Sequence, residues 1–382
     1  MKKIGYILIF YALIFSSCAV LKISNKIKIE ESKDWLMPDG NPSRTNIYKT
    51  NSPLNPPFKL LWSFDNDAAY PIKNLLASDA VLFSGNLKGE IYGIDMISGK
   101  SLGSFSTSSP SQINGFVIYN YDIILSRVGD DKKSIISYNI NTGKENWNTD
   151  FGWVVSSPVL NNDNLIFGTM DGYIIDIQPQ NGSLIWKYKD KNDYNSNQFS
   201  SSSTIYNENI YSGNVNGNIY SLKKSSGLFN WKFKTEGPVY SDVSVFNHKI
   251  FFFSDDMNFY CLDTSGNLVW KKDLSTKSYS SAGFYNELVI TAAVDGFVYA
   301  LNFSTGEIAW KFRTNGSIWA SPLISQGKIF IGSLDEYFYC IRADNGELLW
   351  KYKLEGRIKS NAVIWNDFIF ISSDDKNIYC FK

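Results

Sequence analysis

The sequence contains few of the residues on which most enzyme and metal sites depend. Its 382 residues include one histidine, His248, and four cysteines, no two of which are adjacent. With a single histidine, we discount His-based catalytic triads and most zinc sites. Neither sign of charge is in excess, because 37 Lys and Arg residues balance 37 Asp and Glu residues. The basic residues are scattered, which argues against nucleic acid or another polyanion as a partner.

Long hydrophobic runs are absent except at the N-terminus. Lys2 and Lys3 precede an apolar run over residues 4–15. Such a run is too short to span a bilayer and is typical of the core of a signal peptide. It ends in Phe15-Ser-Ser-Cys18, which resembles the lipobox of bacterial lipoproteins, although a smaller aliphatic residue than phenylalanine is usual there. We therefore predict a lipoprotein signal peptide over residues 1–17, with an ordinary cleaved signal and an incidental cysteine as the alternative.

The lipobox resemblance implies that Cys18 becomes the mature N-terminus and carries fatty acyl chains such as palmitate. Each buried CH₂ group adds about 0.8 kcal/mol, so several chains anchor a protein firmly to a membrane. Ala19 stands where lipoproteins held at the inner membrane often carry Asp, and the resemblance therefore implies the outer membrane. We predict a lipid-anchored protein at its periplasmic face, with the cell surface as the alternative. Residues 18–57 are interpreted as the lipidated tether and a leading segment.

Internal repetition with a period near 40 residues dominates the rest of the chain. Eight short segments of β-forming residues recur, at 89–95, 134–139, 172–178, 217–223, 258–263, 296–302, 337–342 and 377–382. All but the last are followed by a glycine: Gly99, Gly143, Gly182, Gly227, Gly266, Gly306 and Gly346. Four residues after six of these stands a tryptophan: Trp147, Trp186, Trp231, Trp270, Trp310 and Trp350. The first repeat departs from this rule, with Gly103 at the tryptophan position and Phe105 close by.

Each repeat consists of short β-rich runs between turn residues. Asp171-Gly172 and Asp295-Gly296 are strong hairpin signals, because such turns need a positive φ. A tryptophan fixed beyond the next corner can lie over the neighbouring blade and bury on the order of 200 Å². We therefore assign Trp62 and the six repeat tryptophans a structural role in docking one blade on the next.

The two ends of the repeat region indicate how a ring closes. The chain stops at Lys382 on the third strand of the eighth repeat, whereas Trp62 lies in a spare strand with no repeat before it. Pairing these two strands would leave no unpaired edge where the ring joins. The sequence predicts an all-β protein, an eight-bladed β-propeller of four-stranded antiparallel blades over residues 58–382, closed by an N-terminal strand that completes the last blade.

The repeat is similar to that of a known family. Tyr299-Ala-Leu-Asn-Phe-Ser-Thr-Gly306-Glu-Ile-Ala-Trp310 resembles the PQQ-like repeat of quinoprotein dehydrogenases and of their non-enzymatic relatives, and the likeness covers residues 58–382. The lipoprotein branch of that family includes the propeller component of the outer-membrane β-barrel assembly machinery. Residues 34–45 look like the leader that precedes many such propellers, and we expect this leader to pack on the ring and cover the channel.

A quinoprotein enzyme would need a quinone, a Ca²⁺ site and a catalytic carboxylate. Such enzymes usually also carry two consecutive cysteines and often a haem motif, and the sequence contains neither. We therefore expect no catalytic residue, no cofactor and no metal ion. Cys261, Cys340 and Cys380 occupy one equivalent strand position, and we interpret them as small packing residues rather than metal ligands.

One set of equivalent residues suggests a binding site. Tyr240, Tyr279, Trp319 and Lys359 match in register where one blade leads into the innermost strand of the next. From successive blades they would line a shared funnel at one mouth of the channel, and exposed aromatic residues are common binding anchors. Packing between blades is the alternative explanation.

Three functions remain open at this point. The first is a monomeric protein-binding scaffold whose partner is a membrane protein, a barrel-assembly subunit or similar; against it, the insertion over residues 187–203 is polar and lacks the Leu and Arg of the assembly protein's partner-binding loop. The second is a periplasmic or surface module that binds a small molecule, sugar or peptide. The third is a divergent quinone-dependent dehydrogenase.

Overall fold

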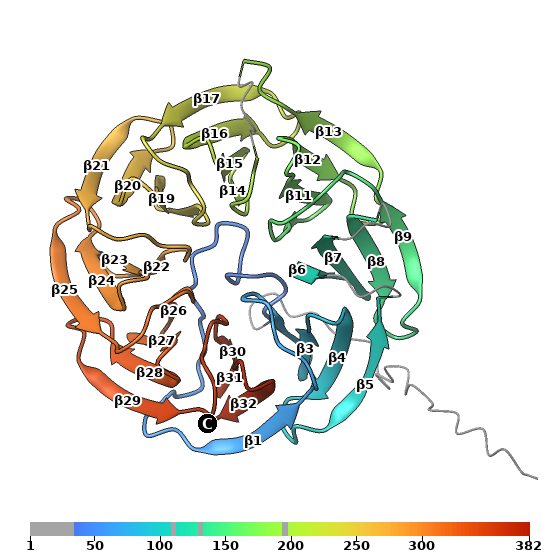
Figure 1. Cartoon of the computed structure of the whole chain (residues 1–382), viewed down its shortest axis with the longest axis vertical. Helices are drawn as coiled ribbons and strands as arrows, with labels where there is room; N and C mark the ends of the chain where they lie inside the picture. The colour runs from blue at the N-terminus through green and yellow to red at the C-terminus, as the bar shows by residue number, and fades with distance from the viewer. Residues whose placement is uncertain (1–33, 108–111, 129–132, 193–197) are drawn as a thin grey trace, which may run out of the picture.

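The chain folds into a closed ring of eight blades around a central axis (Figure 1). The structure, a computed structural model, describes residues 34–107, 112–128, 133–192 and 198–382. The predicted signal peptide and Cys18 lie outside these residues, so that part of the prediction is not tested by the structure. Each blade is a four-stranded antiparallel sheet, and the predicted all-β, eight-bladed propeller is confirmed. No helix in the described ranges is long and apolar enough to cross a membrane.

The strands of each blade follow one another from the axis outward. Blades 1 to 4 contain β2 (Leu75–Ser78), β3 (Val81–Gly85), β4 (Glu90–Asp95) and β5 (Ser101–Ser106); β6 (Gln112–Tyr119), β7 (Asp122–Val128), β8 (Ile135–Asn139) and β9 (Glu145–Thr149); β10 (Val159–Asn161), β11 (Asn164–Gly168), β12 (Ile174–Ile177) and β13 (Leu184–Tyr188); and β14 (Thr204–Tyr206), β15 (Asn209–Gly213), β16 (Asn218–Lys223) and β17 (Phe229–Lys234).

Blades 5 to 7 repeat this order, and blade 8 combines both ends of the repeat region. They contain β18 (Ser244–Phe246), β19 (Lys249–Phe253), β20 (Asn258–Asp263) and β21 (Leu268–Asp273); β22 (Gly283–Tyr285), β23 (Leu288–Ala292), β24 (Phe297–Asn302) and β25 (Ile308–Arg313); β26 (Leu323–Ser325), β27 (Lys328–Gly332), β28 (Tyr337–Arg342) and β29 (Leu348–Lys353); and β30 (Val363–Trp365), β31 (Phe368–Ser372), β32 (Asn377–Phe381) and β1 (Leu60–Asp65).

The ring closes where β1 pairs with β32. The pairing is antiparallel and places Trp62 opposite Cys380 and Asp65 opposite Asn377. Just beyond the strands, the amide of Lys59 donates to the carbonyl of Lys382 at 2.8 Å, and the reverse bond is 3.0 Å long. The predicted closing strand is therefore confirmed, and blade 8 obtains the fourth strand that its own repeat lacks.

The burial pattern within a blade reflects its position between two neighbours. In β19, four of five residues are buried, because both faces of this strand pack against adjacent blades. The outermost strand β21 instead alternates exposed and more buried residues and presents its free edge to solvent. The hairpin glycines allow the tight turns: Gly296 has a φ of +85°, and a Cβ there would lie 2.7 Å from the carbonyl oxygen of Gly316.

Tryptophans on the outermost strands connect consecutive blades. Each indole N–H donates to a backbone carbonyl of the next blade over 2.8–3.2 Å: Trp62 to Met96, Trp147 to Pro179, Trp186 to Lys224, Trp231 to Thr264, Trp270 to Phe303 and Trp310 to Ala343. The indole lies against the corner glycine of that blade, so a Cβ on Gly266 would lie 2.6 Å from the Trp231 ring. Only a residue without a side chain fits there.

Two positions depart from this arrangement. In blade 1, Phe105 takes the place of the missing tryptophan, and its Cβ lies where a side chain on Gly143 would collide at 2.9 Å. Trp350 faces blade 8, whose corner is formed by the two ends of the repeat region. There Phe58 packs edge-on against the Trp350 ring at 5.3 Å.

The three described cysteines are fully buried opposite tryptophan-bearing strands. Cys261 pairs in register with Trp270, Cys340 with Trp350 and Cys380 with Trp62. Burial raises the pKa of the Cys261 and Cys340 thiols to about 12, so these thiols stay protonated at neutral pH. In blade 3 the equivalent position holds Asp176, opposite Trp186.

We expect loss of a docking tryptophan to destabilise the ring. Replacing Trp270, which is 8% exposed, with alanine removes both its packing and its hydrogen bond, and should lower the free energy of unfolding by about 3 kcal/mol. Trp153, which is 54% exposed, is the matched control, and Trp153→Ala should change stability by no more than about 0.5 kcal/mol. Denaturant unfolding followed by fluorescence measures both. Equal effects of the two substitutions would contradict the docking role.

Asp176 should make stability depend on pH. Burial raises the pKa of its carboxyl from 3.8 to about 7, so the folded protein holds a proton that the unfolded chain has already lost. Stability should fall as the pH rises from about 4 to about 7, by roughly 4 kcal/mol if the whole shift is realised. Asp176→Asn cannot ionise, so the thermal midpoint of this variant should be nearly independent of pH across this range. A variant with the same pH profile as the natural protein would show that another group titrates.

Candidate functional site

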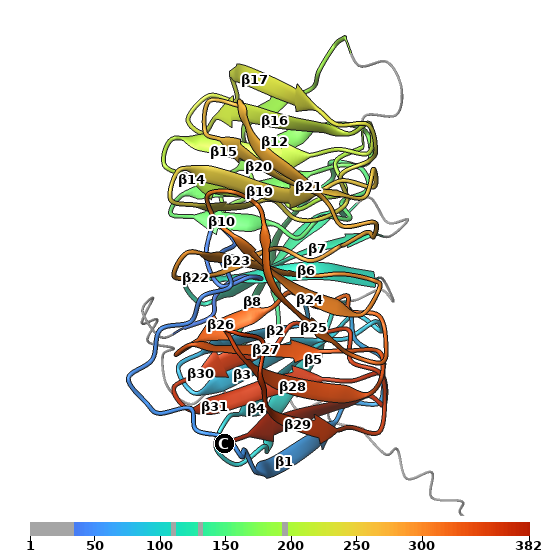
Figure 2. The same ribbon diagram turned by 90° about the vertical axis from the view of Figure 1, so that its left-hand side faces the viewer.

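The predicted leader over residues 34–45 continues along the ring to residue 58, and residues 34–58 are called the leader from here on. This segment crosses the axis of the ring at one face (Figures 1 and 2). Its backbone exchanges hydrogen bonds with innermost strands of several blades: Trp35 with Ala77, Leu36 with Ile118, Pro42 with Ile205, Ser43 with Val245, and Asn46 and Tyr48 with Ile324. These bonds occupy edges of the innermost strands that would otherwise face the channel. The expectation that the leader packs on the ring and covers the channel agrees with these contacts.

Between Met37 and Thr45 the leader inserts two charged side chains, Asp39 and Arg44, into the channel. Arg44 Nη1 lies 2.9 Å from Asp39 Oδ2, and both side chains are almost fully buried. Arg44 also donates to the carbonyl of Ser203 at 2.9 Å and to that of Ser157 at 3.1 Å. Asp39 and Arg44 both have positive φ angles of 63° and 51°, a conformation that side-chain interactions must stabilise in residues other than glycine.

Three residues of the ring complete this network. Lys73 Nζ lies 3.0 Å from Asp39 Oδ2 and also forms an ion pair with Asp242. Asp242 lies 3.7 Å from Arg44, and Asn361 donates to the second oxygen of Asp39 at 2.9 Å. Two carboxylates and two cations therefore balance one another, which removes the large cost of burying an isolated charge.

The network changes the titration of its members. Burial disfavours the ionised form of Asp39, but the neighbouring Lys73 and Arg44 cations outweigh it and lower the pKa of this carboxyl. Burial lowers the pKa of Lys73 to about 8, although Asp39 favours its charged form. The cluster thus holds the leader by charges that are formed at neutral pH.

The opposite mouth of the channel is a pocket of about 550 Å³. Equivalent residues at the start of six blades line it: Pro71, Val155, Ser200, Tyr240, Tyr279 and Trp319. The structure thus brings together the three aromatic residues that the sequence places at the mouth. Lys73 and Asp242 of the buried network also line this pocket. The ion pairs of these two residues with the leader therefore support the floor of the pocket.

Lys359 lies beside the pocket rather than in its lining. Its Nζ is 5.9 Å from the centre of the Trp319 ring and 2.8 Å from a carboxylate oxygen of Asp374. The predicted shared funnel therefore contains Tyr240, Tyr279 and Trp319, with Lys359 behind the last of them. Lysine is longer than the aromatic residues at this position, and its ammonium pairs with the hairpin carboxylate instead of facing the axis.

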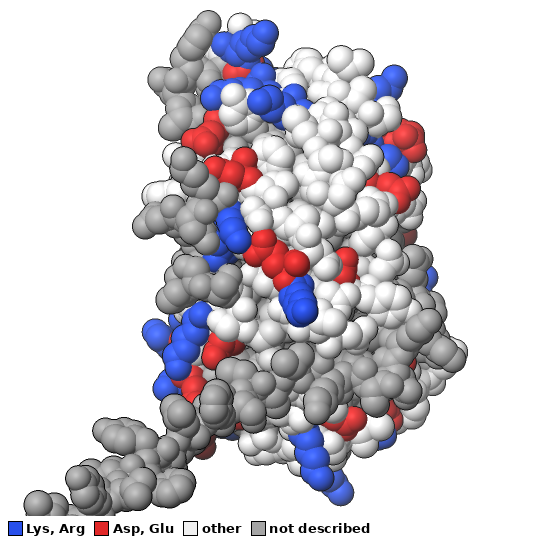
Figure 3. Space-filling view, turned by 90° about the vertical axis from the view of Figure 1, so that its right-hand side faces the viewer, with Lys and Arg blue, Asp and Glu red and all other residues white. Residues whose placement is uncertain are grey.

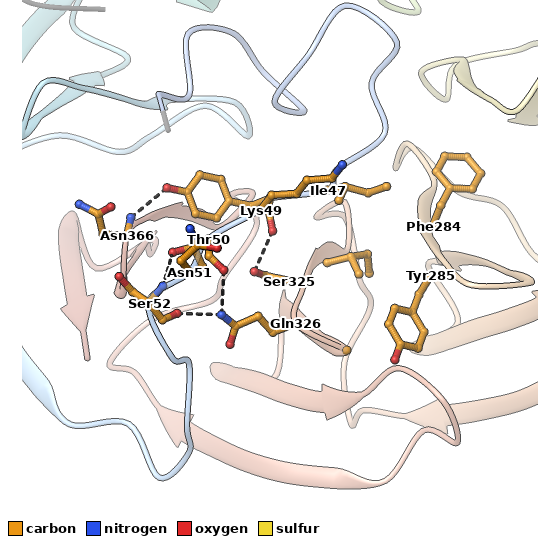
Figure 4. Close-up of a pocket in the computed structure, with 13 residues that line it drawn as sticks. Ile47, Lys49, Thr50, Asn51, Ser52, Phe284, Tyr285, Ser325, Gln326 and Asn366 are labelled. Atoms are coloured by element: carbon orange, nitrogen blue, oxygen red, sulfur yellow. Dashed lines mark hydrogen bonds between the residues drawn. The ribbon is translucent and has the colours of Figure 1, made fainter. Parts of the chain in front are cut away.

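A second pocket of about 700 Å³ lies on the leader face, between residues 47–52 and blades 6 and 7 (Figure 4). Its polar groups hold the leader. The Gln326 side chain donates to the carbonyls of Thr50 and Ser52 at 3.1 and 2.8 Å and accepts from the amide of Leu54 at 3.0 Å. Because these groups are already engaged, we interpret this pocket as a cradle for the leader.

Sequence reasoning missed the buried network. Asp39 and Arg44 lie in a polar leader, and Lys73 and Asp242 are single charges in loops, so none of them carries a periodic signal. One available clue is register: Lys73, Ser157, Ser202 and Asp242 occupy equivalent positions in their blades. A lysine and an aspartate among serines at a channel-facing position point to a charged residue inserted from elsewhere.

Comparison with known proteins gives a family and a shared fold. The profile of the family described as "Outer membrane protein assembly factor BamB" matches residues 87–238, 215–321 and 315–382. BamB from Moraxella catarrhalis superposes with a TM-score of 0.71 at 17% identity, over 85% of this chain and 99% of that one. A search of curated proteins finds none whose sequence matches.

Two enzymes have a similar propeller fold. The quinohemoprotein alcohol dehydrogenase from Comamonas testosteroni has a TM-score of 0.77 at 12% identity, over 95% of this chain and 83% of that one. A europium-containing methanol dehydrogenase has a TM-score of 0.76 at 13% identity, over 92% and 89%. At these identities the likeness establishes the fold alone.

The buried network can be tested by charge removal. Arg44→Met leaves the carboxylates in excess, and should lower the free energy of unfolding by about 3 kcal/mol. The double variant Asp39→Leu/Arg44→Met keeps the remaining Lys73–Asp242 pair neutral and should recover most of that loss. Denaturant unfolding of the two variants provides the comparison. A double variant that is less stable than Arg44→Met would show that the network does not act through charge balance.

Proposed function

Because the chain belongs to the family described as outer membrane protein assembly factor BamB, we propose that it is a non-catalytic scaffold, anchored by lipid at the periplasmic face of the outer membrane, that binds a membrane protein. The observation that carries the proposal is the family match, which continues through three overlapping stretches from residue 87 to residue 382. The partner is a barrel-assembly subunit or a protein of similar kind.

The charges of the channel support a structural rather than a catalytic role. The carboxylates near the axis, Asp39 and Asp242, are each paired with Lys73 or Arg44. Within the described ranges, no group of three or more His, Cys, Asp or Glu side chains is placed to hold a metal ion. Because both carboxylates are already paired with cations, we assign no chemical step to the channel.

The mouth face offers a surface suited to a protein partner. Trp153 lies two residues before the pocket residue Val155 and is 54% exposed. Tryptophan is enriched among the residues that dominate binding energy at protein interfaces. On the flank seen in Figure 3, acidic and basic side chains are intermixed and separated by uncharged areas. This supports a protein partner over a polyanion.

The leader determines which face of the ring lies nearer a lipid anchor at Cys18. Asp34 accepts hydrogen bonds from Ser78 and Trp365 on the leader face. The sixteen residues from Cys18 to Lys33 span at most about 55 Å when fully extended. An anchored ring would therefore stay close to the membrane, with its leader face nearer the anchor than its mouth face.

We expect the full-length protein, solubilised from its native membrane in mild detergent, to co-purify with barrel-assembly subunits identified by mass spectrometry. Trp153→Ala should reduce their recovery several-fold. Leu228→Ala alters an apolar residue on the leader face that is 64% exposed, more than Trp153, and should leave recovery unchanged. Cys18→Ala should release the protein from the membrane and lower recovery.

Recovery of the propeller alone would contradict the scaffold role. Reduction of an artificial electron acceptor that depends on added quinone and Ca²⁺ would instead support the dehydrogenase alternative. These two outcomes are separable, because the first is measured on the membrane protein and the second on the purified ring.

A further inference from the structure

The mouth pocket has the composition of a ligand site. Its volume of about 550 Å³ lies within the range of roughly 300–1,000 Å³ that is typical of small-molecule pockets. Its wall is asymmetric. Tyr240, Tyr279 and Trp319 form one side, whereas Ser200 and Val155 occupy the equivalent positions on the other.

The three aromatic rings form a continuous curved wall without covering one another. The ring centres of Tyr240 and Tyr279 are 6.4 Å apart and inclined at 54°, and those of Tyr279 and Trp319 are 6.3 Å apart and inclined at 70°. Tyr240 and Tyr279 remain 38% and 40% exposed. Rings in this arrangement offer apolar surface for a ligand to pack against.

The floor of the pocket is polar but carries no net charge. Lys73 and Asp242 form an ion pair there, and Ser157, Ser200 and Ser202 also line the pocket. An ionic ligand would have to compete with a charge pair that is already balanced by the leader. A neutral ligand with many hydroxyl groups can instead exchange hydrogen bonds with the outer side of this pair and with the serines.

The backbone at this level of the channel is unsuited to pairing with an extended peptide. Its amides donate to side chains of the following blade: Ser157 to Ser202 Oγ at 3.1 Å, Ser202 to Asp242 Oδ1 at 2.8 Å, Ser281 to Ser321 Oγ at 3.1 Å, and Ser321 to Asn361 Oδ1 at 2.8 Å. Strand addition requires a row of unpaired backbone groups. Recognition here must therefore come from side chains.

From these observations we infer that the channel mouth binds a neutral saccharide of roughly one to three sugar rings. The apolar faces of the sugar rings pack against Tyr240, Tyr279 and Trp319, and their hydroxyl groups exchange hydrogen bonds with Lys73, Asp242 and Ser200. The site lies on the ring itself, so the inference does not depend on the identity of a protein partner.

Isothermal titration calorimetry of the full-length protein in detergent tests this site with maltotriose, cellobiose and N,N′-diacetylchitobiose as probes. We expect at least one of them to bind with a Kd between roughly 10 μM and 1 mM. Trp319→Ala and Tyr279→Ala should each weaken that binding by about tenfold or more, and Trp319→Phe should retain much of it. The matched control Tyr121→Ala alters a tyrosine that is 37% exposed and lies outside the pocket, and it should bind as the natural protein does.

Two results would overturn the inference. One is no heat of binding with any of the three saccharides up to ~10 mM in a protein whose thermal midpoint shows that it is folded. The other is binding of the tripeptide Gly-Trp-Gly, weakened by Trp319→Ala, when no saccharide binds, which would make the mouth a peptide site. Neither result bears on the scaffold proposal, which depends on partner recovery through Trp153 and Cys18.

Discussion

The structure depends on the closure of its ring. Eight repeats supply only three strands for the last blade, and β1 at the other end of the repeat region supplies the fourth by pairing with β32. An open ring would expose the edge of β32 and the face on which Trp350 packs against Phe58. Six of the eight blades hold the next through an indole hydrogen bond. Phe105 and Trp350 make the other two contacts by packing alone. Closure thus allows a chain of local contacts to act as one body.

Closure also determines where the leader lies. Residues 34–58 immediately precede β1, so the pairing of β1 brings them to the ring, and the buried pair Asp39–Arg44 fixes them at the axis. Lys73 and Asp242 then connect the leader to the opposite mouth. One neutral cluster thereby stabilises the leader and forms the polar floor beneath the aromatic wall. The leader is therefore part of the structure that shapes the pocket, although it does not line the pocket itself.

The fold was predictable because its signals repeat. Gly266 and Trp270 belong to a pattern that recurs in six repeats, and the spare strand around Trp62 indicated closure. The aromatic wall was predicted from the equivalent positions of Tyr240, Tyr279 and Trp319 in successive repeats. The buried network could not be found in this way, because Asp39 and Arg44 act through contacts with residues more than a hundred positions away, such as Ser157 and Asp242. Lys359 was placed in the funnel by register, yet its charge pairs with Asp374.

The central claim is that the leader is an integral part of the ring, held in the channel by the buried charges. Hydrogen exchange at the amides of Ile205 and Val245, which donate to the leader carbonyls of Pro42 and Ser43, tests it most directly. The account predicts strong protection of both amides in the natural protein and much faster exchange in a variant that lacks residues 34–47, while the amide of Lys382 in the closing pair stays protected. Unchanged exchange at Ile205 and Val245 after this deletion would contradict it.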